Sequence, residues 1–98
     1  MEHQRLHDPI DVAAIFTRGI ITPKQFRWQA VRYHVDRVNQ RWQSKNGGIV
    51  IRYFAVSVGR DAYKLAFHTK NLMWTIEEVY RDESPGGRIT RGTTCRST

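Results

Sequence analysis

The sequence predicts a small all-β domain built from one antiparallel sheet. Apolar and polar residues alternate with a period of two along most of the chain, which is the spacing of a strand with one buried face. These segments are rich in aromatic and β-branched residues, the types that pack well on a pleated surface. Turn-forming residues separate them at short intervals. With 98 residues, the chain is long enough for a single hydrophobic core only.

Composition divides the chain into a folded body and two short ends. Residues 11–81 hold the alternating segments and form the predicted β-domain. Residues 1–10 contain few apolar side chains, so we expect a loose N-terminal lead-in. In residues 82–98, Ile89 is the only large apolar side chain, so burial cannot offset the entropy lost on ordering. We therefore expect a disordered C-terminal tail.

Five turn signals divide the body into about six strands. The strongest signal contains Asn46, Gly47 and Gly48, because Asn and Gly accept the positive φ of a tight reversal. In chain order, the signals are Arg18-Gly19, Gln29-Ala30, Ser44 to Gly48, Gly59-Arg60 and Lys70-Asn71.

Each predicted hairpin can be tested by the residues that it brings together. A two-residue turn at Gln29-Ala30 sets Trp28 opposite Val31, so apolar side chains meet on one face. The same test aligns the later strands, and the apolar face stays consistent across three of them. The further predicted pairs are Phe26 with Tyr33, Phe54 with Leu65, Val56 with Tyr63, Leu65 with Ile76, Phe67 with Trp74, and Lys64 with Glu77.

Two breaks in the alternation predict a curved sheet. The apolar phase slips between Val35 and Val38 and again between Tyr53 and Phe54. Each slip indicates a β-bulge, and bulges bend strands. We therefore expect a strongly curved antiparallel meander, and its closure into a small barrel stays open.

A helix is the competing prediction at two places. Residues 32–43 fit a helix because Val35, Val38 and Trp42 lie at helical spacing. Residues 11–16 fit a single helical turn. Strands are favoured in both segments because the period of two dominates the body.

The chain is strongly basic, with 16 Lys and Arg against 9 Asp and Glu, a formal charge of +7 and a pI near 10.2. This charge favours an anionic partner, either nucleic acid or an acidic protein. No apolar run approaches a membrane span of about 18 residues, and the first residues do not read as a signal segment. We expect a cytoplasmic protein without a membrane role. Cys95 is the only cysteine, which excludes an internal disulfide.

The first predicted hairpin carries the candidate binding residues. Its register sets Arg27 directly opposite Arg32 on the polar face, and Gln25 opposite His34. Like charges placed this way cost up to about 1 kcal/mol, so we expect a compensating gain from an anionic ligand. Guanidinium groups match phosphate oxygens in a bidentate geometry. With the basic residues that follow, the candidate nucleic-acid contacts are Arg27, Arg32, His34, Arg37, Arg41 and Lys45.

These arginines also have a purely structural interpretation. Their side chains could lie in solvent with their stems over neighbouring aromatic rings, or pair with Asp36 and Asp61. Either arrangement would leave the sheet face without an anion-binding role.

Most aromatic residues fall on the apolar phase and are expected in the core. The exceptions are Trp42, Tyr53 and Tyr80, which the phase slips leave able to face outward. Exposed aromatic rings among arginines can stack on unpaired bases. These three residues therefore form a candidate stacking platform.

The sequence predicts neither a catalytic site nor a metal site. Glu77 and Glu78 are adjacent, so strict alternation sends them to opposite faces and argues against paired acid and base roles. Cys95 lies in the tail, which cannot hold an orienting base. The histidines lack a carboxylate or thiolate at ligand spacing; they are His3, His7, His34 and His68. We expect no cofactor and no enzymatic activity.

A spaced pattern covers most of the body, residues 12–80. It reads Phe26-Arg27-Trp28, Arg32-Tyr33-x-Val35-x-x-Val38-x-x-x-Trp42, Tyr53-Phe54-x-Val56, Tyr63-x-Leu65-x-Phe67 and Trp74-x-Ile76-x-x-Val79-Tyr80. This pattern resembles a family of small bacterial all-β domains of unknown function. The resemblance implies a stand-alone cytoplasmic protein or domain, in some cases encoded near error-prone DNA polymerases, with no established catalytic residues. Such sequences usually have Gly where this chain has Gln29-Ala30.

Two classes of function remain. The first is a non-enzymatic binding module that contacts nucleic-acid backbone through the Arg-rich face, with weak sequence preference. The alternative is a protein-interaction or assembly domain, monomeric or homodimeric, that uses a strand edge or an exposed aromatic patch.

Overall fold

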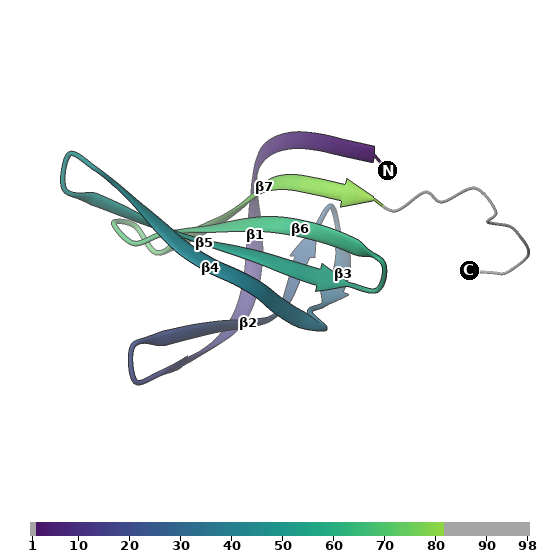
Figure 1. The fold of residues 1–98 in the computed structure, drawn as a ribbon, viewed down its shortest axis with the longest axis horizontal. Coiled ribbons are helices and arrows are strands. Elements are labelled where there is room, and N and C mark those ends of the chain that lie inside the picture. The colour runs from purple at the N-terminus through teal and green to yellow at the C-terminus, as the bar shows by residue number, and fades with distance from the viewer. Residues whose placement is uncertain (1, 82–98) are drawn as a thin grey trace, which may run out of the picture.

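A computed structural model describes residues 2–81, which form one antiparallel sheet of seven strands (Figure 1). The all-β prediction is confirmed, with one strand more than expected. Neither helical alternative is present, since strands occupy both segments. Residues 82–98, where we expect a disordered tail that contains Cys95, lie outside the described residues. The strands are β1 (Glu2–Thr17), β2 (Ile20–Trp28), β3 (Val31–His34), β4 (Arg37–Asn46), β5 (Ile49–Val58), β6 (Asp61–His68) and β7 (Met73–Arg81).

The sheet has the strand order β3-β2-β1-β7-β6-β5-β4. β3 and β4 form its two edges, so the sheet is open and does not close into a barrel. Residues 2–81 contain no helix that is long and apolar enough to cross a membrane.

β1 is shared by the two halves of the sheet. Its first part, Glu2 to Ile10, pairs with β7, and its second part, Asp11 to Thr17, pairs with β2. The strand bends between these parts, so the β1–β2–β3 portion turns away from the other four strands (Figure 1). The expected loose lead-in over residues 1–10 is therefore wrong from residue 2 onward. Ile10 is buried and Leu6 packs against the core, and these two apolar residues hold the segment.

Aromatic contacts join the two halves of the sheet across the core. The Tyr63 ring in β6 lies 5.3 Å from the Phe26 ring in β2 and 5.5 Å from the Tyr33 ring in β3, between centroids. Burial raises the pKa of the Tyr63 hydroxyl to about 12. The buried cluster comprises Ile10, Ile21, Phe26, Trp28, Phe54, Val56, Tyr63, Leu65, Phe67, Trp74, Ile76 and Val79.

The predicted apolar register is confirmed in three hairpins. β2 and β3 pair Phe26 with Tyr33 and Trp28 with Val31. The apolar pairs predicted between β5 and β6 and between β6 and β7 are also present. Lys64 is the exception, because it pairs with Glu78 and not with Glu77. A β-bulge at Glu77 in β7 shifts the partner of Lys64 by one residue.

The predicted phase slips have different outcomes. Near the first slip, the chain leaves β3 after His34, enters β4 at Arg37, and has a bulge between Val38 and Gln40. The second slip, between Tyr53 and Phe54, is wrong, because β5 pairs without interruption there. Regular alternation turns Tyr53 outward and Phe54 into the core.

The β2–β3 turn places two non-glycine residues in the left-handed region, with φ of 53° at Gln29 and 64° at Ala30. This is the backbone of a type I′ turn, which favours Asn and Gly. We predict that Ala30→Gly raises the free energy of unfolding by about 0.5–1 kcal/mol, because it removes the Cβ clash of this conformation. Urea denaturation measures the change.

Ala13→Gly is the matched control, since Ala13 is also exposed but lies in β1. There the substitution should destabilise by about 0.5–1 kcal/mol, because glycine weakens a strand. Equal destabilisation by both variants would contradict a strained turn at Ala30.

Candidate nucleic-acid interface

The predicted juxtaposition of two arginines on the first hairpin is present. Arg27 in β2 pairs directly with Arg32 in β3, and Gln25 pairs with His34. Arg27 also donates from Nη2 to the Asp11 carboxylate at 3.2 Å, with exposed side-chain fractions of 59% and 79%. An ion pair this exposed contributes little to stability, but it neutralises part of the charge at Arg27. Arg32 is therefore the stronger of the two cationic candidates.

A link of two residues joins β3, which carries Arg32, to β4, which begins at Arg37. Val35 extends the β2–β3 ladder by donating its N–H to the Lys24 carbonyl at 2.9 Å, and Asp36 donates its N–H to the Ser57 carbonyl at 2.8 Å. Only two residues of the chain separate the two edge strands, β3 and β4. The Asp36 carboxylate accepts the Gly59 N–H at 2.6 Å, so this carboxylate binds backbone and not an arginine.

Arg41 and Lys45 do not continue the predicted stripe. After the bulge between Val38 and Gln40, each side chain of β4 points to the opposite face from the one that strict alternation predicts. Arg41 therefore pairs with the buried Phe54. The Arg41 guanidinium then reaches β2, where it donates to the Ile21 carbonyl and the Thr22 hydroxyl, each at 3.3 Å. It bridges the gap between β4 and β2 that strand pairing leaves open. Lys45 lies on the same face of β4 as Arg41, near the turn of the β4–β5 hairpin.

The three aromatic residues predicted to face outward lie on the outer face of the sheet. Trp42 and Tyr53 stack at 5.5 Å between ring centroids, and Trp42 is 38% exposed. The Lys64 Nζ lies 4.8 Å from the Tyr53 centroid, which is within the range of a cation–π contact. Tyr80 stacks on His3 at 4.3 Å.

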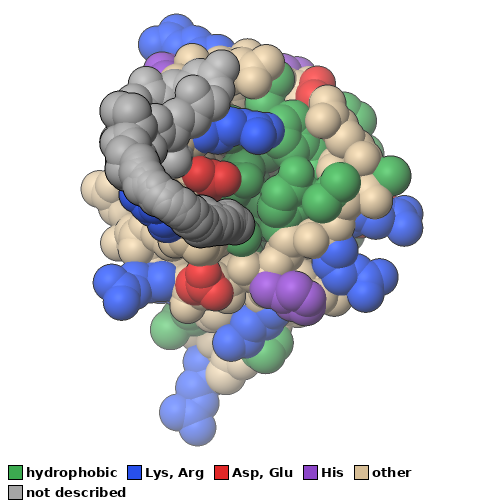
Figure 2. All heavy atoms as spheres, turned by 90° about the vertical axis from the view of Figure 1, so that its right-hand side faces the viewer, with side chains coloured by type: hydrophobic (Ala, Val, Ile, Leu, Met, Phe, Trp, Pro, Cys, Tyr) green, Lys and Arg blue, Asp and Glu red, His purple; other side chains and the backbone are tan. Residues whose placement is uncertain are grey.

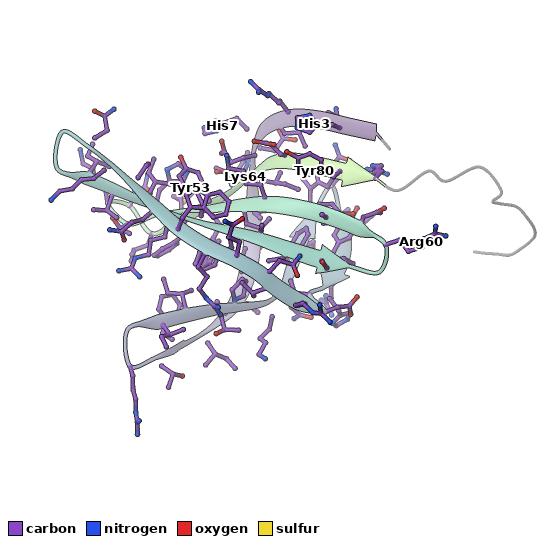
Figure 3. All side chains as sticks on the ribbon, in the orientation of Figure 1. His3, His7, Tyr53, Arg60, Lys64 and Tyr80 are labelled. Atoms are coloured by element: carbon purple, nitrogen blue, oxygen red, sulfur yellow. The ribbon has the colours of Figure 1, made fainter. Side chains whose placement is uncertain are left out.

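Glu78 joins these two aromatic stacks. Its carboxylate contacts Lys64 Nζ at 3.2 Å and His3 Nε2 at 3.0 Å, and it accepts a short hydrogen bond from the Tyr80 hydroxyl. The Tyr80 hydrogen bond, with those from Lys64 and His3, lowers the pKa of Glu78 to about 2. The same bond raises the pKa of Tyr80. Figure 3 shows His3, Lys64, Tyr53 and Tyr80 along one side of the sheet.

Glu77 and Glu78 lie on the same face, which corrects the prediction of opposite faces. Ile76 and Val79 are both buried, so the two residues between them form an outward bulge in β7. Glu77 contacts His7 Nδ1 at 2.9 Å and accepts from the Thr75 hydroxyl at 2.6 Å. The three-residue spacing of Ile76 and Val79 was the sequence signal for this bulge. Within residues 2–81, no group of His, Cys, Asp and Glu residues could hold a metal ion.

A hollow of about 260 Å³ lies between the aromatic stacks. Its floor contains Ala55 and Ala62, whose small side chains leave the sheet surface low. Trp42 borders the hollow on the β4 side and Tyr80 on the β7 side. The remaining lining residues are Gln40, Tyr63, Lys64 and Glu78.

Three carboxylates of the domain accept hydrogen bonds from neutral groups. Asp8 accepts from the Trp28 indole at 3.1 Å, Asp36 from a backbone N–H, and Glu77 from Thr75. Within residues 2–81, no hydrogen bond or ion pair holds the side chains of Arg32 or Arg37. Figure 2 shows Lys and Arg side chains projecting around one end of the molecule, with acidic side chains at scattered points.

Comparison with known proteins finds no matching family model, no matching curated protein and no matching solved structure. The resemblance to a bacterial all-β family therefore stays a prediction.

Glu78 generates a prediction for acid stability. A carboxyl whose pKa is lowered on folding stabilises the fold above its unfolded pKa, near 4.5, and loses that contribution as the pH falls toward 2. We predict that Glu78→Gln lowers the free energy of unfolding at pH 7 by about 1–2 kcal/mol. The variant should also lose less stability than the parent between these two pH values.

Tyr80→Phe is the companion variant, because it removes only the hydroxyl that donates to Glu78. It should reproduce part of the loss at pH 7. Thermal unfolding at a series of pH values measures both variants. Parallel acid profiles for Glu78→Gln and the parent protein would rule out this role for Glu78.

Proposed function

We propose that this domain is a non-enzymatic, cytoplasmic module that binds nucleic acid by its phosphate backbone. The binding residues are Arg27, Arg32, His34 and Arg37, which we term the phosphate surface. One observation carries the proposal. The register of β2 and β3 pairs two arginines directly, and a third arginine begins the opposite edge strand two residues after β3 ends.

The energetics of the phosphate surface support an anionic ligand. Like charges directly opposite each other on a sheet destabilise it by about 0.2–1 kcal/mol. Asp11 relieves this repulsion at Arg27 through an exposed ion pair, whereas the side chains of Arg32 and Arg37 have no ion-pair partner within residues 2–81. Bidentate guanidinium contacts to phosphate oxygens would convert the repulsion into binding energy.

This geometry favours weak sequence preference. Contacts to phosphates position a protein on nucleic acid but carry no direct information about the bases. The phosphate surface consists of side chains on β2, β3 and β4, and the domain has no helix in residues 2–81 to enter a groove. We therefore expect similar affinities for oligonucleotides of different sequence.

A second candidate function is protein interaction or self-association through β4. This edge strand spans Arg37–Asn46, and no strand of the sheet covers its outer side. Uncovered edges can accept an added strand from another chain. Light scattering at increasing protein concentration tests self-association, which would appear as a rising molar mass.

The phosphate surface predicts a salt-dependent affinity. The logarithm of the binding constant should fall linearly with the logarithm of salt concentration, by about 0.7–0.9 for each phosphate neutralised. Arg32→Gln and Arg37→Gln should each reduce this slope by about that amount, since each removes one phosphate contact. Fluorescence anisotropy of a labelled oligonucleotide measures the slope.

Lys70→Gln is the matched control for the loss of one charge. Lys70 is exposed in the turn between β6 and β7, outside the phosphate surface. This variant should keep the slope of the parent protein. An affinity that does not change with salt would refute the proposed function, and equal effects of all three variants would refute the assigned residues.

A further inference from the structure

We infer that the hollow between Trp42 and Tyr80 holds an unpaired nucleobase, so that the preferred polyanion is single-stranded. This inference rests on the proposed function and adds the type of nucleic acid to it. The ligand chemistry is a planar heteroaromatic ring carried on a phosphodiester strand, which both DNA and RNA supply.

The register places the hollow directly beside the phosphate surface. Arg37 pairs with Ser57, Ser57 pairs with Ala62, and Ala62 pairs with Tyr80. These four residues form one row across β4, β5, β6 and β7. Neighbouring strands lie about 4.8 Å apart, so Arg37 is within about 10 Å of the floor residue Ala62. A phosphate on Arg37 therefore lies within reach of a base that enters the hollow.

The side chains of the hollow suit a flat ring. Ala55 and Ala62 keep the floor low, while Trp42 and Tyr80 supply aromatic surface at its two sides. Base–aromatic stacking tolerates any base, because every base has a π face. Gln40 adds an amide at the rim, which can donate to or accept from a base edge.

The negative charge of Glu78 in the hollow is offset by neighbouring groups, which reduces its repulsion of a nucleotide phosphate. Lys64, His3 and Tyr80 all bind the Glu78 carboxylate. The ammonium group of Lys64 lies 3.2 Å from this carboxylate and 4.8 Å from the Tyr53 ring centroid. The Lys64 ammonium group therefore offsets the Glu78 charge beside the Trp42–Tyr53 stack.

A duplex cannot use this hollow in the same way. Its bases are stacked on each other, and an enzyme or binding protein must pay unstacking energy to expose one. A single strand presents its bases to aromatic side chains directly. The hollow therefore favours single strands, whereas the phosphate surface alone would bind both forms.

The test compares an oligothymidylate with an abasic strand that has the same number of phosphates. The full chain should bind the oligothymidylate about tenfold more tightly at one fixed salt concentration, because stacking adds to the backbone contacts. An oligouridylate arm shows whether RNA is held equally well. A duplex with the same number of phosphates should bind like the abasic strand.

Two variants locate the effect. Trp42→Leu should reduce the preference for the base-bearing strand severalfold and leave the affinity for the abasic strand unchanged. Tyr80→Leu should reduce the same preference severalfold. Phe16→Leu is the matched control, because Phe16 is a 61% exposed aromatic near the β1–β2 turn, outside the hollow. Thermal unfolding confirms that each variant is folded.

Tryptophan fluorescence gives a second reading on the parent protein. Trp28 and Trp74 are 4% and 8% exposed, so quenching by a stacked base reports mainly on Trp42. Quenching by the oligothymidylate but not by the abasic strand is expected. Equal, salt-dependent binding of both strands would overturn the stacking site and leave the proposed function intact. Salt-independent binding, or no binding of either strand, would overturn the proposed function itself.

Discussion

The arrangement of this domain depends on a single bent strand. β1 pairs with β7 over Glu2 to Ile10 and with β2 from Asp11 onward, so it belongs to both halves of the sheet. Register shifts between Arg5 and Asp8 and between Ala13 and Ala14 accompany the bend. The bend carries β2 and β3 over the rest of the sheet, where Phe26 and Tyr33 meet Tyr63. It also brings β3 close to β4, which a link of two residues can then join.

The same bend creates the proposed binding surface. Arg32 and Arg37 lie on opposite edge strands of the sheet order, and the Val35–Asp36 link joins these two strands. Where strand pairing fails to close the sheet, Arg41 spans the gap by hydrogen bonds to β2. One predicted phosphate ligand therefore has a structural contact, while two others keep their charge exposed to solvent.

Sequence patterning predicted the parts of this structure that depend on strict alternation. The pairing of Arg27 with Arg32 follows from a two-residue turn and an apolar face, and both are local properties. The bulges were harder to locate, because an added residue changes the facing of every residue after it. The bulge in β4 puts Arg41 on the opposite face from Arg37, and the bulge in β7 puts Glu77 and Glu78 on the same face. The pairing of residues 2–10 with β7 was missed because it joins opposite ends of the described chain, and no local signal reports it.

Mapping of backbone amide chemical shifts tests the central claim most directly, because it locates a ligand without assuming which residues bind it. On addition of a short single-stranded oligonucleotide, the account predicts shifts at Arg32 and Arg37 and across the hollow, at Ala55, Ala62 and Tyr80. The β1–β2 hairpin end near Gly19 should not respond. Shifts confined to that end, or no shifts at all, would contradict binding at the outer face of the sheet.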